Sequence, residues 1–123
     1  STALLIASQY GYFDVVRALV EHGAKIDAKD ADEDDSLMVA AISGHYEIVK
    51  LLVEHGTAIE RTNKAGQTPL TSAAQNGHVN IAALLLAAGA DANTPNSSGA
   101  TALQVANEHK HLDVVRLLLD SGG

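Results

Sequence analysis

The chain has 123 residues, 46% of them apolar, which suits one domain with a hydrophobic core. Aromatic residues make up only 3%, so this core must be built from Leu, Ile, Val and Ala in thin, closely stacked layers. The net charge of −7 and the lack of a membrane-length apolar run argue against nucleic acid or a membrane as the main partner. No cysteine is present, which excludes disulfides and thiol chemistry and fits a reducing compartment such as the cytoplasm or nucleus.

One pattern recurs four times along the chain, with a period of 33 residues and without insertion or deletion from Thr2 to Gly122. Each copy predicts two helices separated by a short turn, and a longer polar turn leads to the next copy. The predicted first helices span residues 3–9, 36–42, 69–75 and 102–108. The predicted second helices span residues 13–21, 46–54, 79–87 and 112–120.

The first copy holds three of the four aromatic residues, Tyr10, Tyr12 and Phe13. Terminal repeats of a stacked array must be atypical to stay soluble, so Tyr12 and Phe13 are expected to shield an exposed end of the stack. Tyr10 is the better candidate for contact with a partner, because its position is polar in the other copies. The corresponding residues there are Ser43, Asn76 and His109.

The second copy contains an acidic run, Asp30-Ala31-Asp32-Glu33-Asp34-Asp35. Glu33 replaces the turn glycine of the third and fourth copies, and a non-glycine residue in a left-handed turn costs about 1 kcal/mol. The tip is therefore expected to be reshaped or mobile. Asp35 can cap the following helix as well as a threonine would. The run is either a solvated charge cluster, an acidic contact for a basic partner, or a weak cation site.

The third copy shows the pattern most fully. Thr68 is suited to cap a helix, and Pro69 supplies a helical φ at the first position, where no N–H is needed. Gly77 accepts the left-handed conformation that often follows the end of a helix. The second helix carries apolar residues at the i, i+3, i+4, i+7 spacing of one buried face. These residues are Ile81, Leu84, Leu85 and Ala88.

The fourth copy has Asn107 and Lys110 where the third has Ala74 and Gly77, and such polar replacements fit a solvated outer end. Acid–base pairs three residues apart recur on the second helices and predict ion pairs worth about 0.2–0.5 kcal/mol each. These pairs are Asp14/Arg17, Glu47/Lys50 and Asp113/Arg116.

The period and its motifs resemble the ankyrin repeat, a turn and two helices with the signature T-P-L-H-x-A. The resemblance covers essentially the whole chain and is closest at Thr68-Pro69-Leu70-Thr71-Ser72-Ala73, followed by Gly77-His78 and by Leu84-Leu85-Leu86 with Gly89-Ala90-Asp91. In the family, the signature His helps to tie neighbouring repeats together by hydrogen bonds. This chain departs from the family at those bonds, because the His is replaced in every copy. The replacements are Leu5, Met38, Thr71 and Gln104.

The resemblance implies an all-α solenoid of stacked helix–turn–helix pairs joined by β-turn or hairpin loops. It also implies a single domain over residues 1–123, with repeats at roughly 1–29, 30–62, 63–95 and 96–123. Small alanines on the first helices and larger Leu and Val on the second helices predict a curved stack. Its concave surface would carry the first helices and the projecting turns.

The resemblance further implies a protein-interaction module that binds through the concave surface and the turn tips. The expected partner is another protein, with a basic patch if it meets the acidic run, and the chain itself is expected to be a monomer. Tyr10 and Ile42, in adjacent layers, are candidates for an apolar anchor. Carried over position by position, the contact residues are Tyr10, Lys29, Asp32, Asp34, Ile42, Ser43, Lys64, Ala65, Gln67, Gln75, Asn76, Ser97, Ser98, Glu108 and His109.

The six histidines invite a metal-binding or catalytic interpretation. Residues 33 apart lie one layer apart and not around a common centre, so structural roles are expected for His45, His78 and His111, and for His22 and His55. No histidine has partners at a convincing ligand spacing, and no phosphate-binding, dinucleotide-binding or hydrolase motif is present. We therefore expect no catalytic activity, no cofactor and no metal.

Two other functions remain open from the sequence. The array could be a structural scaffold without a dedicated partner, including an engineered one, although the irregular Glu33 and Lys110 argue against a pure consensus design. It could also be an accessory segment of a longer multidomain protein.

Overall fold

The computed structural model describes residues 3–23, 34–56 and 59–121, and within this part the chain forms eight α-helices and no β-strand. Every predicted helix is present, with ends that differ from the prediction by at most one residue. The all-α prediction is therefore confirmed. The helices are α1 (Ala3–Tyr10), α2 (Phe13–Glu21), α3 (Ser36–Ser43), α4 (Tyr46–Glu54), α5 (Pro69–Gln75), α6 (Val79–Ala87), α7 (Ala102–Glu108) and α8 (Leu112–Asp120).

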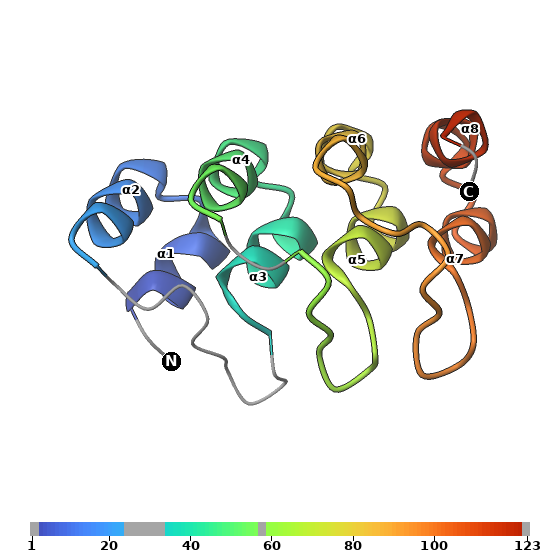
Figure 1. The fold of residues 1–123 in the computed structure, drawn as a ribbon, viewed down its shortest axis with the longest axis horizontal. Coiled ribbons are helices and arrows are strands. Elements are labelled where there is room, and N and C mark those ends of the chain that lie inside the picture. The colour runs from blue at the N-terminus through green and yellow to red at the C-terminus, as the bar shows by residue number, and fades with distance from the viewer. Residues whose placement is uncertain (1–2, 24–33, 57–58, 122–123) are drawn as a thin grey trace.

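The helices stand in two rows (Figure 1). The first helices α1, α3, α5 and α7 form one row, the second helices α2, α4, α6 and α8 form the other, and the turns that precede α5 and α7 project beyond the first row. Neighbouring first helices pack more closely than neighbouring second helices. A stack whose first helices pack more closely than its second helices curves toward the first helices. This is the geometry that the predicted concave side requires.

Side-chain caps begin three of the first helices, two of them at the predicted residues Asp35 and Thr68. Asp35 accepts a hydrogen bond from the Met38 backbone N–H at 2.9 Å, and Thr68 accepts one from Thr71 N–H at 3.2 Å. Thr101 and Gln104 form a reciprocal capping box. Each cap satisfies backbone donors that the first helical turn leaves without a partner.

Equivalent positions of successive copies fill one continuous core. Leu4, Leu37 and Leu70 are each no more than 2% exposed. The prediction that Ala88 is buried is wrong, because α6 ends at Ala87 and Ala88 is its exposed C-cap residue. Ala82 is buried instead.

The ends of the array are less completely covered. Ile48 is 1% exposed, whereas Val15, its counterpart in the first copy, is 48% exposed on the outermost helix pair. The predicted shielding of this end is confirmed in part, since Phe13 packs against the core while Tyr12 remains 57% exposed.

Three histidines bind the layers together. His45, His78 and His111 each donate from Nε2 to a backbone carbonyl of the preceding copy, 36 positions earlier. The accepting residues are Gln9, Ile42 and Gln75, at 2.9, 3.1 and 3.0 Å. The structural role expected for these histidines is confirmed, and they supply inter-repeat hydrogen bonds in a chain that lacks the signature His.

Each of these rings lies directly over a glycine of the copy before it. A Cβ placed on Gly77, whose φ is +74°, would lie 2.7 Å from Nδ1 of His111. A Cβ on Gly11 would lie equally close to the His45 ring, and a Cβ on Gly44 would lie equally close to the His78 ring. Glycine is therefore required both for its backbone conformation and for the space it leaves to the next layer.

The predicted pairs Asp14/Arg17, Glu47/Lys50 and Asp113/Arg116 are not formed, and the ion pair found among the described residues lies on α2. Arg17 pairs with Glu21 one turn further along, with Nε and Oε2 3.3 Å apart, and not with Asp14. Asp14 lies in the first turn of α2, where the positive end of the helix dipole favours a carboxylate. Glu21 lies on the same face of the helix as Arg17 and has the longer side chain.

Replacing Gly77 by Ala should destabilise the chain more than replacing Gly56, whose left-handed backbone has open space around it. Both variants incur backbone strain of about 1–2 kcal/mol. Gly77→Ala also displaces the His111 ring, which adds about 0.5–1.5 kcal/mol for the lost hydrogen bond. Urea unfolding measures both. In a His111→Ala background, Gly77→Ala should cost no more than Gly56→Ala. A larger cost of Gly77→Ala in that background would contradict the contact between His111 and Gly77.

Leu70→Ala should lower the free energy of unfolding by about 2–5 kcal/mol, because Leu70 is 1% exposed and its removal leaves a cavity between layers. Leu119→Ala is the matched control on the outer end, where the side chain is 60% exposed, and should cost less than about 1 kcal/mol. Equal losses in urea titrations would show that the Leu119 side chain is packed as tightly as that of Leu70.

Candidate functional site

The candidate surface consists of the turn tips before the first helices and the exposed residues at the C-terminal ends of those helices. Lys29 and Asp32 lie outside the described residues, as does the turn around Glu33. The other sequence-predicted residues are all accessible to some degree. The half-buried ones are Asp34, Ile42, Gln67 and Gln75, and the exposed ones are Tyr10, Ser43, Lys64, Ala65, Asn76, Ser97, Ser98, Glu108 and His109.

Two asparagines shape the tips of the third and fourth copies. Oδ1 of Asn63 accepts hydrogen bonds from the backbone N–H groups of Ala65 and Gln67, at 3.0 and 3.1 Å. Oδ1 of Asn96 accepts equivalent bonds from residues 98 and 100, at 2.9 and 3.0 Å. Sequence reasoning missed both residues, although their spacing of 33 and the glycine three positions after each were visible signals.

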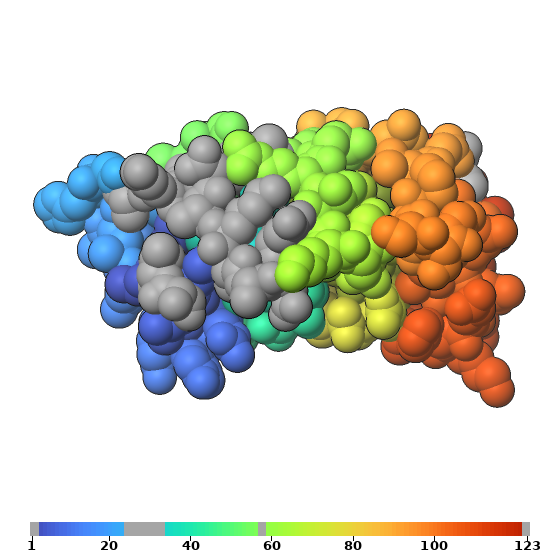
Figure 2. Space-filling model, turned by 90° about the horizontal axis from the view of Figure 1, so that it is seen from below, coloured from blue at the N-terminus to red at the C-terminus, as the bar shows by residue number. Residues whose placement is uncertain are grey.

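The tips are joined to one another across the copies. The Ser97 N–H donates to the Ala65 carbonyl at 3.0 Å, and Nδ2 of Asn63 donates to Oδ1 of Asp34 at 2.9 Å. Gly66, with φ +72°, permits this approach, since a Cβ there would lie 2.7 Å from Ser97 N. Figure 2 shows the resulting ridge on the face seen from below, with the tip before α5 in green beside the tip before α7 in orange.

Amide side chains extend from the third tip onto α5. Gln67 donates from Nε2 to Oε1 of Gln75, and the Ser72 hydroxyl, which lies 3.1 Å from Met38 Sδ, is 3.5 Å from Oε1 of Gln67. Asn76 donates from Nδ2 to the Ser72 carbonyl at 2.8 Å. This part of the candidate surface is therefore polar and held in place by its own hydrogen bonds.

The predicted anchor of Tyr10 and Ile42 stays a prediction. The Tyr10 ring is 62% exposed and stacks on Tyr12, with ring centroids 6.1 Å apart. Ile42 lines a depression of about 160 Å³ between the first two copies, together with Gln9, Asp34, Val39 and Ser43. The apolar wall that Val39 adds to this depression was not predicted.

The fourth copy has a polar depression of about 320 Å³, lined in part by Ser98 and Glu108 and also by Gln104 and Asn107. His109 donates from Nδ1 to the Val105 carbonyl at 2.9 Å, and its ring stacks on His111 at a centroid distance of 6.2 Å. Its ring is therefore fixed by contacts within its own copy.

The chemistry of the candidate surface is that of hydrogen bonding and small apolar contacts. Among the described residues, no group of three or more His, Asp and Glu side chains is arranged to hold a metal ion. In the same part of the chain, no helix has the length and apolar character needed to cross a membrane.

A protein-family model described as ankyrin repeats (3 copies) matches residues 1–63 and again residues 37–123. The chain therefore belongs to the ankyrin-repeat family, as the sequence resemblance implies. No curated protein matches the chain. Ankyrin repeats are in general protein-interaction modules and are typically not enzymes.

Asn63→Ala should loosen the third tip, because two backbone donors lose their acceptor and Asp34 loses its cross-copy partner. We expect faster hydrogen exchange at the amides of Ala65 and Gln67 and a loss of about 1–3 kcal/mol in unfolding free energy. Asn96→Ala is the matched control, since it removes the equivalent bonds of the fourth tip and leaves Asn63 and its bonds in place. Unchanged exchange at Ala65 and Gln67 would show that Asn63 does not hold the tip.

Proposed function

We propose that this chain forms one ankyrin-repeat domain without catalytic activity, whose function is to bind a partner protein through the candidate surface. The observation that carries the proposal is a row of exposed side chains, one in each layer, that differ between copies. The row comprises Tyr10, Ser43, Asn76 and His109. The apolar positions repeat because stacking requires them, whereas this row is free to vary and can carry recognition.

The fixed conformation of the tips supports the same proposal. Association costs less conformational entropy when the contact groups are already fixed. The Asn63 and Asn96 bonds fix the tips internally, and the Ser97–Ala65 bond fixes one tip against the next. A partner would meet a preformed ridge with several backbone and amide groups in known positions.

The charge of the chain indicates the kind of partner. The net charge is −7, and Asp34 and Glu108 lie on the candidate surface. We therefore propose a partner protein with a basic patch, whose approach the acidic groups would accelerate in a salt-dependent way. Nucleic acid, membrane surfaces and cofactors are not part of the proposal, and the chain would act as a monomer.

The proposal is tested on a partner captured from the source lysate, by measuring its association and dissociation rates. Ser43→Arg together with Asn76→Arg places two large charges in the exposed row and should weaken binding at least about tenfold, mainly through dissociation. Asp32→Asn together with Glu108→Gln should slow association at low salt and have less effect at high salt.

The control for both variants is Glu47→Gln with Asp113→Asn on the second-helix row, which changes the net charge by the same amount and should leave the affinity within about twofold. Circular dichroism and urea unfolding verify the fold of each variant. Loss of binding in this control, with none in the exposed-row variant, would assign recognition to the second helices and overturn the proposal.

A further inference from the structure

A groove of about 510 Å³ opens between the C-terminal ends of α6 and α8. It belongs to the second-helix row, away from the turn tips that project beyond the first row (Figure 1). Its lining combines alanine and leucine residues with Asp91, Asn93 and Ser121. The residues that line it are Ala83, Leu86, Ala87, Ala90, Asp91, Ala92, Asn93, Leu117 and Ser121.

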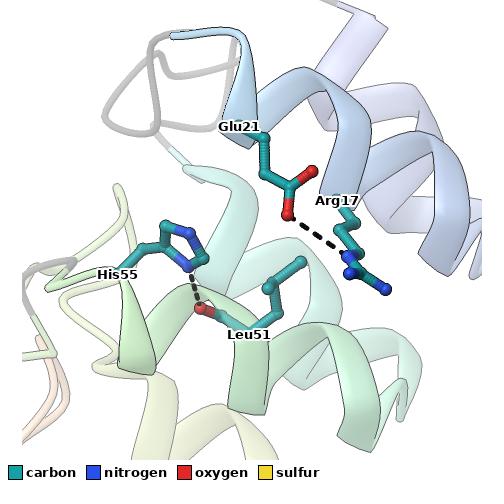
Figure 3. Close-up of polar contacts among 4 residues, drawn as sticks. All are labelled: Arg17, Glu21, Leu51 and His55. Carbon is teal, nitrogen blue, oxygen red and sulfur yellow. Dashed lines mark hydrogen bonds and ion pairs between the residues drawn. The ribbon is translucent and has the colours of Figure 1, made fainter.

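The equivalent positions on α2 and α4 carry charged and polar side chains. Figure 3 shows Arg17 and Glu21 on α2 opposite Leu51 and His55 on α4. Arg17 is paired with Glu21, and His55 donates from Nδ1 to the Leu51 carbonyl at 2.9 Å. A guanidinium, a carboxylate and an imidazole therefore stand at these positions, and the Arg17 and Glu21 side chains are 58% and 53% exposed.

A shift of 66 residues maps the four residues of Figure 3 onto the lining of the α6–α8 groove. Leu51 corresponds to Leu117, so the apolar wall is kept. The three polar side chains are replaced by small ones, since Arg17 becomes Ala83, Glu21 becomes Ala87 and His55 becomes Ser121. The α6–α8 groove therefore lacks the three polar side chains found at the equivalent positions of α2 and α4.

The electrostatics of the groove favour a cation. It lies at the C-terminal ends of two helices, where the helix dipole is negative, and neither helix has a basic residue in its last turn. The exposed Asp91 adds a carboxylate to the rim, with Oδ1 held by the Asn93 N–H at 2.9 Å. α6 itself carries no charged residue.

We propose that the α6–α8 groove receives an arginine side chain of a partner protein. The methylene stem would pack on Ala83, Ala87 and Leu117, and the guanidinium would lie toward Asp91 and the two helix ends. Arginine suits such a site better than lysine because its guanidinium is planar and more weakly hydrated. The volume is within the range of ligand sites in proteins and leaves room for neighbouring partner atoms.

This groove lies apart from the candidate surface, so the two can be tested separately. The probe is a capped Gly-Arg-Gly tripeptide, titrated into the chain while methyl chemical shifts are followed by NMR. We expect saturable shifts at Ala83, Ala87, Leu86 and Leu117, with a dissociation constant in the millimolar range. Gly-Lys-Gly should bind more weakly, and a tripeptide with norleucine, which keeps the stem but lacks the charge, more weakly still.

Two variants locate the site. Ala83→Arg with Ala87→Glu restores the Arg17–Glu21 pair in the third copy and should abolish the shifts. Asp91→Asn leaves both helices unchanged and should weaken binding roughly two- to fivefold, so the test stands even if the first variant folds poorly. Asn76→Ala on the candidate surface should leave the titration unchanged, which separates this groove from the proposed function.

Three results would overturn the proposal. One is the absence of saturable shifts at tens of millimolar of the arginine peptide. Another is equal binding of the norleucine peptide, which would indicate an apolar occupant. The third is unchanged binding to Asp91→Asn, together with unchanged binding to Ala83→Arg/Ala87→Glu if that variant folds.

Discussion

The whole structure depends on the contact between each helix pair and the next. A single pair of short helices cannot bury its apolar side, so the core exists only where layers meet. At each of these junctions a histidine ring lies on a glycine of the preceding layer and donates a hydrogen bond to a carbonyl of that layer. His111, for example, lies over Gly77 and donates to the Gln75 carbonyl. The contact needs a ring in one copy and the absence of a Cβ in the copy before it. The residue types at these two positions therefore depend on each other.

The same contact explains why recognition can be separated from folding. Stacking fixes the apolar positions and the His–Gly pairs, and it leaves free the side chains that point away from both neighbours. On the first-helix side these are the exposed row and the tips, which Asn63 and Asn96 hold in place. On the second-helix side the copies differ in the side chains at equivalent positions. Arg17 and Glu21 form an ion pair on α2, whereas Ala83 and Ala87 on α6 line the α6–α8 groove.

The helices and most of the core follow from the sequence, because a register without gaps repeats most caps, glycines and leucines at known positions. Arg17 has two acids within reach on one helix, and the choice of Glu21 depends on side-chain geometry. The stacking of Tyr10 on Tyr12 likewise depends on rotamers. The tip asparagines and the replacements of Arg17 and Glu21 by alanine are visible in the register, but the bonds and the volume they produce appear only in three dimensions.

The measurement that tests the central claim most directly is hydrogen–deuterium exchange of the chain with and without its captured partner. If recognition lies on the first-helix side, the partner should slow exchange in the tips at 63–67 and 96–100 and at residues 42–43 and 75–76. The middle of α2 and α4 should exchange at the same rate in both states. Protection confined to the second-helix row, with the tips unchanged, would contradict the assignment of recognition to the exposed row.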